Sequence, residues 1–223
     1  MNDYTPPIVT VDAVLFQLIQ NRLYVLLIER ANEPFKGAFA LPGGYNAAGE
    51  TTLDCLERVI ANKAGVALRS LKLVEQLYTF DTVARDPRGH AVSITYMGYG
   101  KDIVPRESST TQSPGFFPID ELPKLAYDHA DIIDYAHKRL AAKITYTNAV
   151  FALLDTFFTL SQLQAAYEAI FGRPLDKRNF RKKFLGLDLI RETDEYFREG
   201  AHRPARLYTF KSQELETLQR SFD

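Results

Sequence analysis

The chain has 223 residues, of which 46% are hydrophobic and 25% are charged, and its net charge is −1. This composition is ordinary for a globular protein and allows one large domain or two small ones. The near-zero charge excludes a global field that would attract nucleic acid or membranes, so any nucleic-acid site must be a local basic patch. Cys55 is the single cysteine, which excludes an internal disulfide, and no apolar run approaches the ~20 residues of a membrane helix. We expect a cytoplasmic protein with no membrane partner.

The first 142 residues contain both strand-like and helix-like segments. Runs of β-branched and aliphatic residues predict strands at 8–16, 23–28, 71–79 and 91–99. Apolar residues at helical spacing predict a helix that starts after Thr51 or Thr52 and ends at Gly65, and a second helix at about 130–142. Because these elements follow each other without regular βαβ alternation, we expect an α/β fold with a mixed sheet between helices.

The character of the sequence changes after residue 142. We expect helices at 144–158, 160–171 and 177–185, then strands near 189–191 and 206–210 that flank a polar hairpin loop. The first of these helices has apolar residues on more than one face, which is typical of a domain junction or a dimer contact. The order helix, helix, turn, helix, strand, wing, strand predicts a winged helix-turn-helix. The sequence therefore predicts two domains, 1–142 and 143–223.

The loop and helix at 44–66 carry a spacing that resembles the Nudix box. In that family the box reads G-x5-E-x7-R-E-U-x-E-E-x-G-U, where U is an aliphatic residue. Three glutamates of the pattern are replaced here by Val59, Asn62 and Lys63. The resemblance covers roughly residues 8–142 and implies the α/β/α sandwich of Nudix proteins. The positions that match are Gly44, Glu50, Arg58, Ile60, Gly65 and Val66.

The replaced glutamates bear on whether the box can hold a metal ion. Nudix hydrolases cleave diphosphate bonds with Mg²⁺ or Mn²⁺, which need several carboxylate oxygens near the substrate phosphates. Glu50 alone cannot supply them, and Glu57 lies about 200° around the helix from the first expected glutamate. Lys63 would repel a divalent cation. We expect no catalytic residue, no metal and no required cofactor. Two interpretations stay open: the loop and helix are only scaffold, or the cleft still binds a diphosphate nucleotide without hydrolysing it.

Several side chains of the first domain are candidates for a nucleotide cleft. The stretch 79–89 has the form T-F-x4-R-D-P-R-G, which resembles a signature of ADP-ribose pyrophosphatase-like Nudix proteins and their regulatory relatives. Arginine suits a diphosphate because its planar fork bonds two oxygens at once. The alternatives are a surface turn for this stretch, a core position for Phe39 and a structural role for His129. The predicted ligand-binding residues are Arg30, Phe39, Gly43, Gly44, Arg85, Asp86, Arg88 and His129.

Basic residues cluster in the last predicted helix of the second domain. Phe180 and Phe184 are four residues apart and face the core, which leaves the basic residues, Arg181 among them, to share a face away from it. That arrangement is typical of a recognition helix, and Asn179 is able to read adenine in the major groove. A solvated charged face is the alternative for any such run. The predicted DNA-binding residues are Arg173, Lys177, Arg178, Asn179, Arg181, Lys182, His202, Arg203 and Arg206.

A degenerate Nudix domain followed by a winged helix resembles the Nudix-related transcriptional regulators, of which the NrtR regulators of NAD metabolism are the best-known group. The motifs that carry the resemblance are LPGGYNAAGE, TFDTVARDPRG, YDHADII and FTLSQLQAAYEAIFGRPLDKRNFRKKF. It implies a homodimer that binds double-stranded DNA at a palindromic operator, as a repressor whose effector is ADP-ribose or a related nucleotide. Under this interpretation the helix predicted at 144–158 transmits ligand binding to the DNA-binding domain.

The sequence leaves three alternatives to a regulator of NAD metabolism open. The same architecture occurs in regulators of sugar catabolism that bind a different ligand. The chain could instead be an active Nudix hydrolase, such as an ADP-ribose pyrophosphatase, that draws its carboxylates from elsewhere. A ligand-binding adaptor that contacts protein instead of DNA is the third class.

Overall fold

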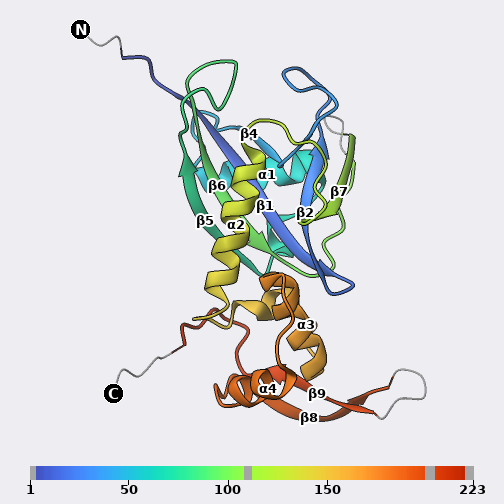
Figure 1. The fold of residues 1–223 in the computed structure, drawn as a ribbon. Helices are drawn as coiled ribbons and strands as arrows, with labels where there is room; N and C mark the ends of the chain where they lie inside the picture. Colours follow the sequence, from blue (N-terminus) through green and yellow to red (C-terminus); the bar gives the residue numbers. More distant parts are fainter. Residues whose placement is uncertain (1–3, 108–111, 199–203, 219–223) are drawn as a thin grey trace. The chain divides into compact units, whose positions relative to one another are not determined.

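The computed structural model describes residues 4–107, 112–198 and 204–218 (Figure 1). The chain divides into two compact units, Met1–Gln17 with Tyr24–His137 and Leu18–Leu23 with Lys138–Asp223. The division falls inside the helix α2 (His129–Lys143). No helix in the described part of the chain is long and apolar enough to span a membrane.

The first unit is built on a mixed β-sheet. Its strands are β1 (Ile8–Ile19), β2 (Arg22–Glu29), β3 (Phe39–Ala40), β4 (Gly43–Tyr45), β5 (Leu73–Phe80), β6 (Ala91–Tyr99) and β7 (Gln112–Pro118). Within the described residues the main strand order is β3-β2-β1-β6-β5, while β4 pairs with β1 and β7 pairs with β2. β1 and β6 run parallel, with Ile8 opposite Ala91, whereas β5 and β6 are antiparallel. The predicted mixed sheet is confirmed.

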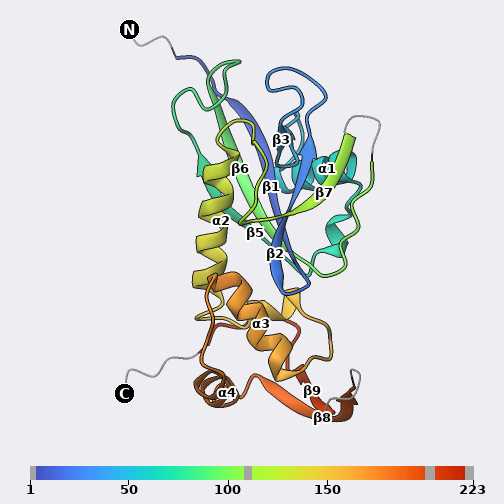
Figure 2. The same cartoon turned by 45° about the vertical axis from the view of Figure 1, so that its right-hand side comes forward.

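Helices cover both faces of this sheet. Figures 1 and 2 show α1 (Thr52–Ala64) and α2 on opposite faces, and the 3-10 helix η1 (Leu68–Ser70) follows α1. Burial along β1 is therefore continuous from Thr10 to Gln17 instead of alternating, because neither face of the strand meets solvent. Leu56 and Ile60 of α1 pack into the same core as Val11 and Leu15 of β1. The predicted α/β/α arrangement is confirmed.

Local capping signals determine both ends of α1. The Thr51 hydroxyl accepts the backbone N–H of Asp54, and the Asp54 carboxylate accepts the backbone N–H of Thr51, which forms a capping box. Gly65 follows the helix at φ 63°, a left-handed conformation that favours glycine, and its N–H donates to the carbonyl of Ala61. The helix therefore has the predicted start and end.

The second unit has the element order of a winged helix-turn-helix. Its elements are the 3-10 helix η2 (Ala149–Leu153), α3 (Leu160–Phe171), α4 (Lys177–Leu185), β8 (Ile190–Phe197) and β9 (Ala205–Phe210). Thr159 caps α3 through a capping box with Gln162, and the Asp176 carboxylate caps α4 by accepting the N–H of Asn179. Both helices have the predicted bounds. The aromatic core of the unit contains Phe151, Phe158, Tyr167, Phe180, Phe184 and Phe210.

The prediction of a helix at 144–158 is wrong. α2 ends at Lys143, and the predicted range holds turns and the short helix η2. The Thr147 hydroxyl donates to the carbonyl of Lys143, and the Asn148 side chain bonds the backbone of Glu214 and Glu216. These side-chain bonds to the backbone compete with helix continuation. The apolar residues of the segment are buried by these turns instead of by helix faces.

Candidate functional site

A cleft of about 570 Å³ opens in the first unit. β1, β2, β4, the turn at 85–88 and the start of α2 contribute its walls. Phe39 is not among the residues that line it; its half-buried ring packs against Phe117 with centroids 4.8 Å apart. The cleft brings together the other predicted ligand residues, which are Arg30, Gly43, Gly44, Arg85, Asp86, Arg88 and His129.

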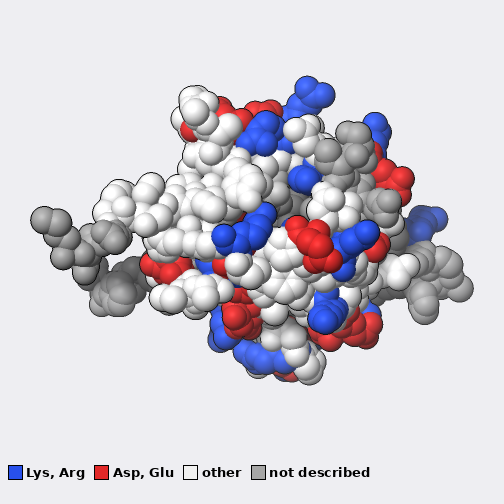
Figure 3. All heavy atoms as spheres, turned by 90° about the horizontal axis from the view of Figure 1, so that it is seen from above, with Lys and Arg blue, Asp and Glu red and all other residues white. Residues whose placement is uncertain are grey.

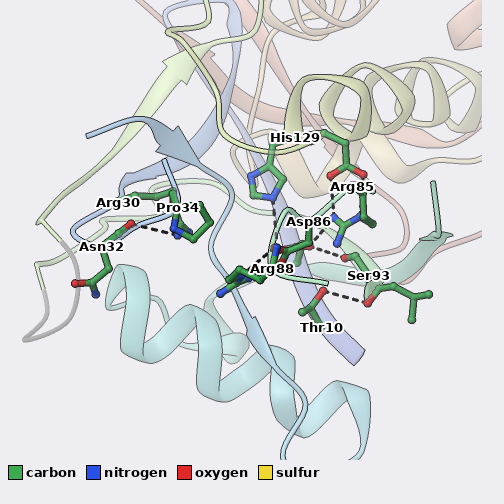
Figure 4. Close-up of polar contacts among 12 residues, drawn as sticks. Thr10, Arg30, Asn32, Pro34, Arg85, Asp86, Arg88, Ser93 and His129 are labelled. Atoms are coloured by element: carbon green, nitrogen blue, oxygen red, sulfur yellow. Dashed lines mark hydrogen bonds and ion pairs between the residues drawn. The ribbon is translucent and has the colours of Figure 1, made fainter. Parts of the chain in front are cut away.

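Asp12 of β1 belongs to a buried polar network at the cleft. Its partners Arg85, Ser93 and His129 are labelled in Figure 4. The Ser93 hydroxyl donates to Asp12 Oδ2 at 2.5 Å, and His129 Nε2 lies 3.8 Å from Asp12 Oδ1. The backbone N–H of Leu41 donates to His129 Nδ1 at 2.9 Å, so the ring proton of a neutral imidazole sits on Nε2, facing Asp12. Burial lowers the pKa of His129, which keeps the imidazole neutral.

The guanidinium group of Arg85 bonds carboxylates of the protein. Its Nε and Nη2 donate to the two carboxylate oxygens of Asp128 at 2.9 and 2.8 Å, and Nη2 lies 3.6 Å from Asp12. The side chain is almost fully buried. Because its fork already holds Asp128, Arg85 fixes the start of α2 at the cleft wall.

Arg88 is oriented by Asp86. Its Nη2 donates to Asp86 Oδ2 at 2.6 Å, and these hydrogen bonds lower the pKa of the buried Asp86 carboxyl. The Arg88 guanidinium also lies 5.3 Å from the ring centroid of Tyr45 and 5.7 Å from that of Tyr127. Its side chain is still 38% exposed. Arg88 is therefore held in place and remains accessible to an anion.

Tyr127 is the main cleft residue that the sequence did not single out. The Arg30 guanidinium lies 4.8 Å from its ring centroid, and Arg30 Nε donates to the carbonyl of Pro34 at 2.8 Å. The Tyr127 hydroxyl is buried and has no hydrogen-bond partner in the structure. Its place beside Asp128 and His129 in the motif YDHADII was the signal that could have found it.

The cleft is lined by charges of both signs, with Glu29 and Glu33 among the carboxylates. Neither Arg30 nor Lys63 forms an ion pair with a carboxylate of the described residues, although both line the cleft. On the face seen in Figure 3, Lys and Arg side chains lie beside Asp and Glu side chains, without a continuous patch of either sign. Arg30 and Lys63 are therefore the cleft cations that a bound anion could contact without displacing a carboxylate.

The matching part of the Nudix box has a structural role. Glu50 accepts hydrogen bonds from Arg58 Nε at 2.5 Å and from Arg58 Nη2 at 2.8 Å, and it also accepts the N–H of Ala47. These bonds, the one from Arg58 first, lower the pKa of Glu50 to about 2. Val59 is 2% exposed and belongs to the core. Among the described residues, no group of three or more His, Cys, Asp or Glu side chains is placed to hold a metal ion.

The second unit presents a basic surface on α4. Arg178, Asn179 and Lys182 are exposed, as predicted for the outward face. Arg181 departs from that prediction: it is only partly exposed, its Nη2 donates to Ser161 of α3 at 3.1 Å, and its Nε is buried. The other exposed basic residues of this surface are Arg173, Lys177 and Lys183.

Arg206, the predicted wing residue that the structure describes, is already paired. Arg206 forms an ion pair with Glu192 and donates to the hydroxyl of Tyr196 at 2.6 Å. β8 also exposes Asp194 and Glu195. β8 continues through Tyr196, which pairs with Arg206 of β9. The sequence predicted a loop, not a strand, at this part of β8. His202 and Arg203 lie outside the described residues.

Comparison with known proteins agrees with this arrangement. The Nudix domain family matches residues 6–136, and the NrtR DNA-binding winged helix domain family matches residues 150–210. Fold and cleft thus define the class: a Nudix domain joined to a DNA-binding type of winged helix. The chain belongs to the NrtR-like family of Nudix-fused winged-helix regulators.

Three relatives bear on function. The chain is 33% identical, over 96% of its length and 86% of the relative, to the ADPR responsive transcriptional repressor NtrR of Acinetobacter baylyi. Shewanella oneidensis NrtR in complex with a 27mer DNA has a TM-score of 0.76 and 31% identity, covering 91% of this chain and 93% of that one. The Nudix domain of the same protein, complexed with ADP ribose, gives a TM-score of 0.57 and 31% identity over 61% of this chain and 90% of that one. An ADP-ribose pyrophosphatase of Methanocaldococcus jannaschii is 38% identical over 59% of this chain and 75% of the relative.

Proposed function

We propose that the chain is a DNA-binding transcriptional repressor that senses ADP-ribose or a closely related nucleotide. One observation carries this proposal: a single chain combines an arginine-lined Nudix cleft, without the glutamates of the Nudix box at 59, 62 and 63, with an exposed basic helix in a winged-helix unit. Relatives that match nearly the whole chain are described as an ADPR responsive repressor and as a DNA complex.

The cleft suits a diphosphate group. Arg88 is accessible and oriented by Asp86, and Arg30 and Lys63 lack carboxylate partners among the described residues. Gly43 allows the backbone of β4 to approach Asp12 closely, because a Cβ at this position would lie 1.9 Å from Asp12 Oδ1. A nucleotide diphosphate would meet cations here without needing a metal to neutralise it.

The α4 surface suits the major groove of double-stranded DNA. Arg178 and Lys182 supply positive charge for phosphates, and Asn179 between them can bond an adenine edge. We propose a homodimer that places two such helices on a palindromic operator near genes of NAD metabolism. Family membership supports this assembly and these targets. A regulator of sugar catabolism with a different sugar-derived ligand is the alternative within the same family architecture.

Helix α2 is the proposed route between ligand and DNA. Its first residue, His129, lines the cleft, and its last turn, after His137, belongs to the second unit. It replaces the segment 144–158 in this role, because that segment is not a helix. If ADP-ribose weakens DNA binding by a given factor, linkage requires DNA to weaken ADP-ribose binding by the same factor.

We propose that the cleft binds without hydrolysis. Of the box carboxylates only Glu50 is present, and its two oxygens are held by Arg58. The alternative, an ADP-ribose pyrophosphatase, is favoured by the 38% identity of the first unit to such an enzyme. Release of AMP from ADP-ribose in the presence of Mg²⁺ or Mn²⁺ at ordinary enzymatic rates would support that alternative.

The test uses the full chain with fluorescent duplexes tiled across the region upstream of its own gene and across NAD-pathway promoters. We expect sequence-dependent binding that ADP-ribose changes at least fivefold, and calorimetry should show the reciprocal change in ADP-ribose affinity when the duplex is present. A chain that binds ADP-ribose but no duplex in preference to random DNA would contradict the regulator and favour the adaptor. A chain that binds DNA but not ADP-ribose would contradict the effector.

A further inference from the structure

The Tyr127 hydroxyl is one of two buried side-chain nitrogen or oxygen atoms among the described residues that lack a hydrogen-bond partner; the other is Arg181 Nε. A buried hydroxyl without a partner costs stability, because it gave up its hydrogen bonds to water on folding. Tyr127 itself lines the cleft and has a left-handed backbone conformation, at φ 54°. The fold therefore maintains an unsatisfied polar atom and a strained residue at the same place, next to the proposed ligand.

The charged groups around Tyr127 indicate which kind of ligand atom its hydroxyl would bond. Two guanidinium groups lie close to the ring, that of Arg30 at 4.8 Å and that of Arg88 at 5.7 Å from the centroid. The edge of Phe35 packs against the ring at 4.9 Å, and His129 lies at 5.2 Å. These distances run to the ring, so both cations lie at the residue whose hydroxyl lacks a partner. A ligand atom that bonds this hydroxyl in their field is most stable when it is an anionic acceptor.

The hydroxyl is suited to donate. Burial raises the pKa of Tyr127 in spite of the opposing charges of Arg30 and Arg88, so the phenol keeps its proton at neutral pH. We propose that the Tyr127 hydroxyl donates a hydrogen bond to a diphosphate oxygen of the bound nucleotide and selects for ligands that carry that group. This inference rests on the proposed ADP-ribose cleft and names the residue that reads the diphosphate.

Tyr45 provides a matched comparison within the same cleft. Its ring also lies near Arg88, at 5.3 Å, and it also lines the cleft. The residue is 50% exposed, however, and its hydroxyl is not among the buried atoms without a partner. Tyr127→Phe and Tyr45→Phe each remove one hydroxyl from a ring that contacts Arg88, and only the first removes a buried hydroxyl without a partner.

The experiment measures ADP-ribose affinity and thermal stability for the wild-type chain and both variants. We expect Tyr127→Phe to weaken ADP-ribose binding at least about tenfold, as for a lost hydrogen bond to a charged group, and to leave the melting temperature of the unliganded chain unchanged or higher. Tyr45→Phe, which removes an exposed hydroxyl of the same cleft, should weaken ADP-ribose binding clearly less than Tyr127→Phe does. Adenosine, which lacks the diphosphate and is measured by displacement, should bind equally well to the wild-type chain and to Tyr127→Phe.

Each outcome separates this role from its alternatives. Equal ADP-ribose affinity of Tyr127→Phe and wild type would overturn the role of the hydroxyl, and so would a lower melting temperature, because it would show that the hydroxyl has a partner in the folded chain. An equal loss for adenosine and ADP-ribose would overturn the assignment to the diphosphate. Failure of the wild-type chain to bind ADP-ribose would instead overturn the proposed effector.

Discussion

Arg85 and Asp128 form a two-pronged ion pair, with hydrogen bonds of 2.9 and 2.8 Å between a buried guanidinium and a mostly buried carboxylate. The arginine comes from the 85–88 turn, and the carboxylate immediately precedes α2. A residue predicted to hold the ligand thus holds the helix that leads away from the ligand cleft. Disturbing the pair is expected to affect the fold before it affects affinity.

Asp128→Ala should lower the free energy of unfolding by about 3 kcal/mol, because Arg85 would stay buried with its main partner removed. Urea unfolding followed by circular dichroism measures this. Glu192→Ala is the control, since its ion pair with Arg206 is exposed and should contribute much less to stability. Equal effects of the two substitutions would show that the Arg85 pair is not a buried structural contact.

Gly43→Ala and Gly44→Ala should differ sharply although they are neighbours. A Cβ on Gly43 would overlap Asp12 Oδ1 at 1.9 Å, whereas a Cβ on Gly44 would meet Val59 Cγ2 at 3.0 Å. We expect Gly43→Ala to destabilise the chain by about 2 kcal/mol or more and to abolish ADP-ribose binding, because Asp12 must move out of its network. Gly44→Ala should keep measurable binding. Melting temperature and calorimetric titration of both variants check this, and a reversed order would argue against the geometry of the Asp12 network.

The salt dependence of DNA binding should distinguish the phosphate contacts made by α4 from those made by the wing. Replacing both Arg178 and Lys182 with alanine should weaken binding and reduce the slope of log K against log salt by about two per protomer, as expected for the loss of two phosphate contacts. Arg206→Ala should change the slope by less than one, because Glu192 already neutralises Arg206. Fluorescence anisotropy at several salt concentrations gives both slopes. A larger change for Arg206→Ala would assign the phosphate contacts to the wing instead.

Acid titration should expose the contribution of Glu50. Its pKa in the folded chain is about 2, against an ordinary value of 4.5, so the pairing with Arg58 stabilises the fold fully above pH 4.5. The stabilisation should then be lost as the pH falls from 4.5 toward 2. Glu50→Gln should melt at a lower temperature than the wild-type chain at pH 7, and the difference should disappear near pH 2. A difference that persists at pH 2 would mean that the carboxylate acts through packing instead of charge.

Helix ends were predictable where the decisive residues are close in sequence. Thr51 with Asp54, and Thr159 with Gln162, form capping boxes between residues three apart, and Asp176 caps α4 over the same distance. The segment 144–158 failed because its conformation depends on distant partners. The Asn148 side chain bonds the backbone near residue 215, and no local pattern contains that information.

In the cleft, too, the sequence predicted what depends on local motifs and missed what depends on distant residues. Most predicted ligand residues do line it, since the turn at 85–88 and the glycine pair are local motifs of the family. What each side chain does inside the cleft depends on residues far along the chain. Arg85 is held by Asp128, Phe39 packs on Phe117, and Arg181 of the other unit bonds Ser161. The motif YDHADII points to Tyr127 as a cleft residue, but the missing partner of its hydroxyl depends on the folded surroundings and has no sequence pattern.

Val59 is the position at which a single substitution is least able to add a metal-binding carboxylate to the Nudix box. Asn62 is exposed and Lys63 partly exposed, so either can become a carboxylate without burying a charge. A glutamate at position 59 would place an ionised group in the apolar core beneath Gly44, where burial disfavours it. Two of the three replaced glutamates are therefore one tolerated step away, while the third requires a compensating change nearby.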